Sequence, residues 1–417
     1  MKTTKYQSIS RMNALKNKNP VFPVKTQPRL YGFLKFLKVT VFTLAVLIST
    51  QNFALAEGFE KTLTLDLSVK TALSINPDVL INEQKMEFAR QRIYEARALY
   101  FPKIYLNLNF SKFNNTSPMV LPEDITGTPV YLPAGIKDIY YATRVSAWQN
   151  IYAGGRVKTT NKLAKINMDK TKNEADIVKI KVINNVKRAF NACLYYKEKT
   201  KFYEKASAKI KSVELERKLA ASKFYYNKEL LTLLSAIGLE LNAIVDVSGE
   251  FKPRVRNFDI SRCMLLAYQF KPEMQATQQQ ESSDALIVNL LSMQQYPTVY
   301  VGASQEWTGD QIIGDDSNWY VSLNVNIPVF DGGGTFARIK QGKINMREAS
   351  LKRSKREDEI RLNINKALIE YNFWKEQAAN ISKNPSEYTE TDLDIINSLN
   401  NSYYALELAV GVELDSY

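Results

Sequence analysis

The sequence contains the same pattern twice, at one constant offset. One alanine, two prolines and one tyrosine carry it, at Ala72, Pro77, Pro102 and Tyr105 and again at Ala267, Pro272, Pro297 and Tyr300. A glycine motif at 151–155 (IYAGG) returns at 329–333 (VFDGG), at a smaller offset, so the second copy has a shorter loop. Helical periodicity precedes strand periodicity in both copies. The repeat therefore predicts a duplicated helix, strand, strand, helix unit.

The first 56 residues have the composition of a secretory signal peptide. They hold nine Lys or Arg and no Asp or Glu, and an apolar run at 39–48 precedes the small-residue motif Ala54, Leu55, Ala56. We expect a signal peptide at 1–56 and a mature chain that starts near Glu57. The apolar run is about half of the ~20 residues that a spanning helix needs. A membrane anchor remains the alternative.

Charge and composition exclude several classes of function. Without the predicted signal peptide the chain has 47 basic and 43 acidic residues, spread along helical segments, which is typical of solvated faces and not of a nucleic-acid interface. The chain has no histidine, which excludes Ser-His-Asp catalysis and most zinc chemistry. The glycine runs lack phosphate-binding spacing. We expect no enzyme activity, no cofactor and no metal.

The two cysteines, Cys193 and Cys263, lie in helical patterns of different halves. We interpret them as buried small apolar residues, with a structural disulfide as the alternative.

Four segments alternate between apolar and polar residues, at about 103–113, 140–152, 297–307 and 318–330. Each is close to the ~10 residues of a tilted transmembrane strand, and aromatic residues such as Trp148 gather near the strand ends. The residues predicted to face lipid are Leu106, Leu108, Trp319, Val321, Leu323 and Val325; those predicted to face a lumen are Asn107, Asn109, Ser322, Asn324 and Asn326. A soluble sheet with one buried face is the alternative. Four strands cannot close a barrel, so we expect the chain to oligomerise.

The rest of each copy predicts long helices. Residues 156–238 and 335–411 are rich in Lys, Glu, Ala, Ile and Leu, and each predicts a helical hairpin closed by a glycine, Gly238 or Gly411. The second hairpin has a clear turn signal at 382–386, whereas the first has none. We expect strand and helix to meet at Pro102, Gly154, Gly155, Pro297, Gly332, Gly333 and Gly334.

Three motifs resemble the TolC-type outer-membrane efflux proteins of Gram-negative bacteria. They are residues 69–77 (VKTALSINP), residues 96–104 (ARALYFPKI) before the first strand, and residues 327–334 (IPVFDGGG) after the fourth. The resemblance covers nearly all of the mature chain, with a first repeat at 57–250 and a second at 251–417.

The resemblance implies a mainly helical chain with membrane strands. Helical hairpins would form a periplasmic α-barrel, and four strands per subunit would contribute to the 12-stranded β-barrel of a homotrimer. The implied function is a passive exit duct in the outer membrane for efflux or type I secretion, and its implied partners are a periplasmic adaptor and an inner-membrane transporter.

Both hairpins look shorter than those of the family. Halving each one gives arms of roughly 60 Å. A soluble periplasmic coiled-coil structural or adaptor protein, or a degenerate member of the family, therefore remains an alternative.

Two acidic residues, Asp392 and Asp394, are the candidates for a periplasmic gate. A threefold ring of carboxylates would attract cations and narrow the end of the duct. The alternative is an ordinary helix N-terminus that acidic residues stabilise. Asp310, Asp315 and Asp316 lie between the third and fourth strands and predict a solvated loop.

Overall fold

The computed structural model describes residues 62–112, 120–121, 130–131, 139–210, 212–381 and 388–414. The predicted signal peptide lies outside the described residues, and so does the predicted turn at 382–386. All of the described residues belong to one compact unit.

The described elements repeat in the predicted order. The first copy contains β1 (Thr62–Leu63), α2 (Leu65–Ile75), α3 (Pro77–Ala98), β2 (Lys103–Lys112), β5 (Ile139–Tyr152), α4 (Arg156–Lys209) and α5 (Val213–Ile237). The short strands β3 (Val120–Leu121) and β4 (Val130–Tyr131) pair with each other between β2 and β5. The strand β6 (Asp246–Val247) follows α5 near the end of the first copy. The second copy contains α6 (Ile260–Phe270), α7 (Pro272–Ser292), the 3-10 turn η1 (Met293–Gln295), β7 (Thr298–Gly309), β8 (Asp316–Asn326), α8 (Gly334–Ala378) and α9 (Glu390–Val410).

The boundaries of these elements follow the two offsets of the sequence repeat. The helices α6 and α7 follow α2 and α3 at the offset of the repeated prolines, and α8 follows α4 at the smaller offset of the glycine motif. Pro77 and Pro272 each occupy the first turn of their helix, where the missing N–H costs nothing. Local sequence signals therefore set the starts of the helices.

The main sheet is antiparallel throughout, in the order β2, β5, β7, β8. Its centre, β5 with β7, joins the two copies, and its outer strands β2 and β8 each pair along one edge only. A separate parallel pair, β1 with β6, ties the start of the first copy to its end.

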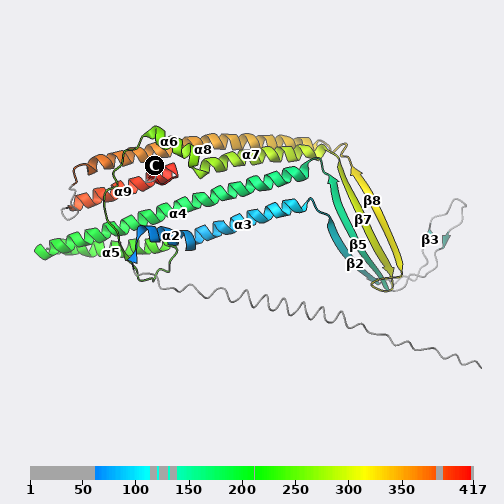
Figure 1. Ribbon diagram of the computed structural model, residues 1–417, viewed down its shortest axis with the longest axis horizontal. Coiled ribbons are helices and arrows are strands. Elements are labelled where there is room, and N and C mark those ends of the chain that lie inside the picture. The colour runs from blue at the N-terminus through cyan, green and yellow to red at the C-terminus, as the bar shows by residue number, and fades with distance from the viewer. Residues whose placement is uncertain are drawn as a thin grey trace, which may run out of the picture. The chain divides into compact units, whose positions relative to one another are not determined.

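The helices form a layer in the same order as the strands (Figure 1). Near the sheet, α4 lies between α3 and α7, and α8 contacts α7. Farther from the sheet, α5 takes the place of α3 beside α4, and α9 takes the place of α7 between α4 and α8. The long helix α8 is thus lined by α7 and α9, which follow one another along its length. The long helix α4 is lined by α3 and α5 on one side and by α7 and α9 on the other.

Two apolar clusters hold the end of this layer that is remote from the sheet. One joins α2, α4 and α5 around Val186, Leu233 and Ile237, and the other joins α6, α8 and α9 around Ile364 and Tyr403. Each fully buried aliphatic side chain in these clusters stabilises the folded chain by about 1.5–3 kcal/mol.

The two cysteines belong to these clusters. Cys193 lies in the first cluster and Cys263 in the second, and both are buried and free. The interpretation as small apolar residues is confirmed, and the alternative of a disulfide is wrong. Burial raises the pKa of the Cys193 thiol to about 12, with a smaller effect of Glu229 in the same direction.

The predicted end of the fourth strand is wrong. The fourth strand was expected to reach residue 330, but β8 ends at Asn326. Its last residue pairs with Thr298, the first residue of β7, and Pro297 before it has no N–H to continue the ladder.

The arms of the hairpins are also unequal. The first hairpin turns near Ile210 and Ser212, so α4 has 54 residues and α5 has 25, and in the second hairpin α8 has 45 residues and α9 has 21. Halving the hairpins was wrong because α3 and α7 already cover the part of each long helix nearest the sheet. At 1.5 Å per residue, α4 alone is about 80 Å long.

Among the described helices, none contains a stretch that is long and apolar enough to cross a bilayer.

Candidate functional site: sheet, junctions and hairpin tip

The main sheet has two chemically different faces. Strand pairing aligns Leu106 with Val145, and Val145 with Gln305, which lies opposite Trp319. Side chains alternate along a strand, so all the residues predicted to face lipid lie on this one face. The residues predicted to face a lumen all lie on the other: Asn107, Asn109, Ser322, Asn324 and Asn326.

The apolar face is exposed in the single chain. Leu108, Trp319 and Leu323 are 65–70% exposed. The polar face carries an ion pair, in which the Arg144 guanidinium lies 2.8 Å from the Glu306 carboxylate. An uncovered apolar face opposite a polar face is what a sheet between lipid and water needs.

One aromatic residue lies on the unexpected face. Trp148 was grouped with interfacial aromatics, but it pairs with Gly302 and Lys103, on the side of Asn107. A Cβ atom at Gly302 would come within 2.2 Å of the Trp148 ring. The glycine leaves room for the indole, which packs over β7 on the polar side beside Tyr300.

Glycines make the junctions from strand to helix. Gly155 and Gly333 cap α4 and α8 with φ of 81° in both copies, a left-handed conformation that side chains disfavour. Gly154 has φ of 59°, and a Cβ there would come within 2.6 Å of the Tyr296 Cβ. In the second copy the Asp331 carboxylate accepts a hydrogen bond of 2.7 Å from the Thr335 N–H.

The remaining predicted junction residues lie at the same boundaries. Gly332 has φ of 67°, and Gly334 is the first residue of α8. Pro102 and Pro297 each immediately precede a strand. The structure thus places every predicted junction residue within a few positions of a change from one element to another.

Two equivalent hydrogen-bonded contacts between helix ends, which we call the helix joints, were not among the predicted features. In the first copy, the Asn76 side-chain amide donates a 2.8 Å hydrogen bond to the Ala236 carbonyl near the end of α5. In the second copy, the Lys271 ammonium donates to the equivalent carbonyl of Ala409 at 2.6 Å, and also to Leu408 at 3.1 Å. The offset of the repeated prolines relates Asn76 to Lys271, so the repeat itself contained the signal.

The Lys271 ammonium is unusual because it is buried. The residue is 6% exposed, and burial lowers the pKa of its ammonium. The C-terminal carbonyls of α9 supply the negative end of a helix dipole, which partly offsets this burial. The lysine therefore fastens α9 end-on to α7, as Asn76 fastens α5 to α3.

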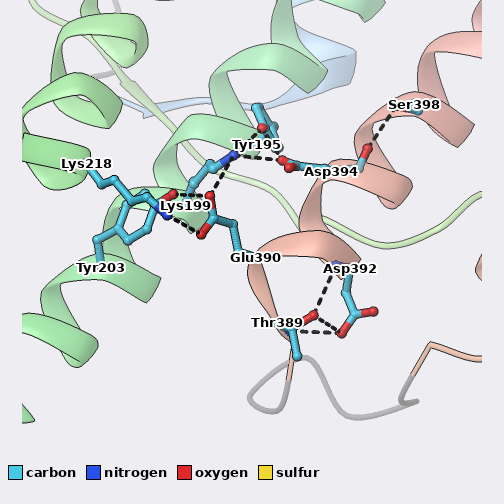
Figure 2. A network of polar contacts seen from close by, with 9 residues as sticks. All are labelled: Tyr195, Lys199, Tyr203, Lys218, Thr389, Glu390, Asp392, Asp394 and Ser398. Carbon is cyan, nitrogen blue, oxygen red and sulfur yellow. Dashed lines mark hydrogen bonds and ion pairs between the residues drawn. The ribbon is translucent and has the colours of Figure 1, made fainter. Parts of the chain in front are cut away.

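The first gate candidate, Asp392, caps its own helix (Figure 2). Thr389 and Asp392 form a capping box at the start of α9: the Thr389 N–H donates to the Asp392 carboxylate at 2.9 Å, and the Asp392 N–H donates to the Thr389 hydroxyl at 3.2 Å. This is the role that the alternative interpretation of the sequence gave to this residue.

The second candidate, Asp394, belongs to a network between α4 and α9 (Figure 2). Its carboxylate accepts hydrogen bonds from the Tyr195 hydroxyl and, at 2.7 Å, from the Lys199 ammonium. Burial and the Asp394 carboxylate raise the pKa of Tyr195. The network holds α9 against α4 near the hairpin turn.

Glu390 extends this network to α5. It accepts hydrogen bonds from the Tyr203 hydroxyl at 2.6 Å and from the Lys218 ammonium at 3.1 Å. The hydrogen bond from Tyr203, with help from Lys218, lowers the pKa of the Glu390 carboxyl. Acidic residues of the second hairpin thus pair with basic residues of the first, an arrangement that sequence periodicity did not reveal.

A buried ion pair holds the other end of α9. The Lys187 ammonium lies 3.1 Å from Glu407 and 3.0 Å from Glu413, and Lys187 and Glu407 are both less than 10% exposed. Burial opposes the charge on Lys187, but the two carboxylates outweigh it, and its pKa is raised.

The described residues contain no group of three or more Cys, Asp or Glu residues that could hold a metal ion.

A family model matches the first copy of the repeat. Residues 69–218 match the family model of the outer membrane efflux protein. The predicted resemblance to TolC-type efflux proteins is confirmed. The matched segment runs from α2 into α5 and so contains the first two strands of the sheet and all of α4. The predicted outer-membrane location, with an extension into the periplasm, is confirmed as well.

Solved outer-membrane channels share the fold. The CmeC outer membrane channel of Campylobacter jejuni is 15% identical, with 83% of this chain and 85% of that chain covered and a TM-score of 0.62. The open state of the MtrE outer membrane channel of Neisseria gonorrhoeae is 13% identical, with 84% and 89% covered and a TM-score of 0.64. The outer membrane protein VceC of Vibrio cholerae is 13% identical, with 84% and 96% covered and a TM-score of 0.59. The predicted fold class, long helical hairpins with four strands per subunit, is confirmed.

No curated protein sequence matches this chain.

Proposed function

We propose that the chain is one subunit of a homotrimeric exit duct in the outer membrane, which passes small molecules or secreted proteins from an inner-membrane transporter and a periplasmic adaptor. The observation that carries this proposal is the main sheet, which has one exposed apolar face, one polar face and two outer strands with a free edge. Three such sheets joined edge to edge would leave no unpaired edge.

The helical layer supports the same assembly. The side of α8 that points away from α7 carries a stripe of exposed apolar residues; these are Ile344, Leu351, Leu362, Ile369 and Phe373. The stripe runs opposite Gly342, which contacts Leu291 and Val288 of α7. A neighbouring subunit at this edge would bury the stripe, and about 25 cal/mol per Å² of apolar area would favour the contact.

The proposed duct is passive, so its energy comes from the partner transporter. The role of Asp392 and Asp394 as a periplasmic constriction also stays a proposal. Their hydrogen bonds within the chain support a second role, the closure of the α9 N-terminus against α4.

Fractionation and reconstitution test the proposal together. The mature chain should appear in the outer-membrane fraction as a heat-modifiable trimer, and the purified protein should conduct ions in a planar bilayer. A soluble periplasmic monomer without conductance would refute the duct and favour the coiled-coil adaptor.

A further inference from the structure

The two long helices carry the same lysines at the same distance from the sheet. Residues 165–168 of α4 read KINM, and residues 343–346 of α8 read KINM as well, at the offset of the glycine motif. Lys162 and Lys340 are equivalent at the same offset. We call Lys162, Lys165, Lys340 and Lys343 the basic belt.

The belt lies within the first three turns after each strand-to-helix junction. Its lysines come six and nine residues after the first residues of α4 and α8, which is about 9–14 Å along the axis. All four are exposed. Within the described part of the chain, none of the four makes an ion pair or a side-chain hydrogen bond.

Neither helix carries a carboxylate before or within the belt. The first carboxylate of α4 is Asp169, four residues after Lys165 and so on the same side of the helix. The first carboxylate of α8 is Glu348, which pairs with Lys352 at 2.7 Å. The nearby carboxylates of other segments have partners of their own, since Glu95 pairs with Arg92 at 2.9 Å and Asp331 with Arg338 at 3.5 Å. The four lysines of the belt thus outnumber the carboxylates of their own helices beside them, and the patch at the foot of the sheet is positive.

Exposed apolar residues precede the belt in both copies. Ile151 and Tyr152 end β5, and Val329 and Phe330 follow β8 at equivalent positions, with 49–91% of each residue exposed. An aromatic residue followed by lysines is the arrangement that anchors a protein where hydrocarbon gives way to headgroups.

The position of the belt around α4 points away from the lumen. A groove between α3 and α4 is lined by Thr160 and Leu163, and Lys162 and Lys165 come two residues after them, about 200° around the helix. Leu99 lines this groove and also a pocket beside Trp148 on the polar face of the sheet. The groove thus continues the polar face, and the belt lies on the opposite side of the helix.

We propose that the basic belt binds the phosphate groups of anionic phospholipids in the membrane leaflet next to the helices, and so fixes the depth of the channel in the bilayer. This inference rests on the proposed membrane insertion of the sheet. Each lysine close to an anionic membrane surface should favour anionic lipid by up to about fivefold.

The test compares two lipids on the same inserted protein. The mature chain is inserted into phosphatidylcholine liposomes, its heat-modifiability is checked, and the association of spin-labelled phosphatidylglycerol is measured against that of spin-labelled phosphatidylcholine. The wild-type protein should prefer phosphatidylglycerol several-fold, and high salt should weaken the preference by screening.

The variants locate the effect. Combined Lys162→Ser, Lys165→Ser, Lys340→Ser and Lys343→Ser changes should bring the preference close to one. The matched control removes four exposed lysines that lie farther along α4 and α8 and should keep the preference; it combines Lys205→Ser, Lys209→Ser, Lys355→Ser and Lys366→Ser.

The outcomes separate this inference from the proposed function. A wild-type chain that fails to insert overturns both. Insertion without a preference for phosphatidylglycerol, or a preference that the belt variant retains, overturns the belt alone. A belt variant with unchanged lipid preference but altered ion selectivity in a planar bilayer would place the lysines in the lumen instead, which also overturns the inference.

Discussion

The substitution Val321→Arg tests the orientation of the sheet most directly. Val321 is the sixth of the eleven residues of β8 and is 65% exposed on the apolar face. At ~3.3 Å per residue and a tilt of about 40°, β8 spans an apolar band of about 25 Å, so Val321 lies near the middle of the bilayer.

The expected cost follows from this position. An arginine on the lipid face at the midplane destabilises a membrane strand by about 2–4 kcal/mol. In the proposed trimer each of three copies bears this cost, about 6–12 kcal/mol in total. That is comparable to the whole stability of a typical domain, so the variant should fail to insert.

The neighbouring residue supplies the control. Tyr320 lies on the polar face opposite Ser304 and is 44% exposed, so Tyr320→Arg adds the same charge one position away but toward water. Flotation of liposomes and the heat-dependent shift on a gel measure the inserted fraction. If Val321→Arg inserts as completely as Tyr320→Arg, the apolar face does not contact lipid and our reasoning is wrong.

Two further predictions concern the helices. Gly238→Ala places a Cβ atom at φ of 92° and within 2.9 Å of the Asn76 Cα, so it should lower the free energy of unfolding by well over ~1 kcal/mol. The control Gly332→Ala has φ of 67° and no atom within 4 Å, so it should cost only ~1 kcal/mol. Equal unfolding midpoints for the two variants would show that close packing between Gly238 and Asn76 does not matter for stability. The hydrogen bond from Tyr203 lowers the pKa of Glu390 from its ordinary 4.5, so the stability that Glu390 contributes is present above that value and lost as pH falls through the lowered value. Urea midpoints measured below pH 4.5 should therefore fall more steeply for the wild type than for Glu390→Gln, and parallel curves would show that the network does not stabilise the tip.

Much of the fold was predictable because its signals are local. Pro77 and Pro272 fix helix starts, and Gly238 and Gly411 end α5 and α9 with φ of 92° and 87°. These residues act through their own backbone dihedrals, so a single sequence reveals them. The two faces of the sheet were predictable for the same reason, since alternation depends on the strand alone.

The element boundaries that the sequence did not predict depend on the neighbouring strand or helix. The end of β8 is set by where β7 begins. The turn of the first hairpin has no Gly or Pro to mark it in the sequence, since α4 ends where Ile210 adopts φ of −133°. The return of α5 along α4 is decided by the packing of residues such as Leu233 and not by a turn motif.

The gate candidates show the same limit. The sequence placed Asp392 and Asp394 near a helix start but gave no means of finding Tyr195 and Lys199, which lie in the other copy of the repeat. Opposite charges on segments so distant carry no periodic signal.

The duplicated unit, its strands and helices, the opposed faces of the sheet and the family resemblance were determined by the sequence itself, through periodicity and the dihedral preferences of proline and glycine. Only the tertiary structure decided that α3 and α5 share one long neighbour and that Lys271 closes a joint that asparagine closes in the other copy. It also decided that Lys162 and Lys165 lie on the side of α4 opposite the groove that continues the polar face of the sheet. The physical reason is that these features depend on distances between residues far apart in the chain, which chain connectivity leaves free and packing fixes.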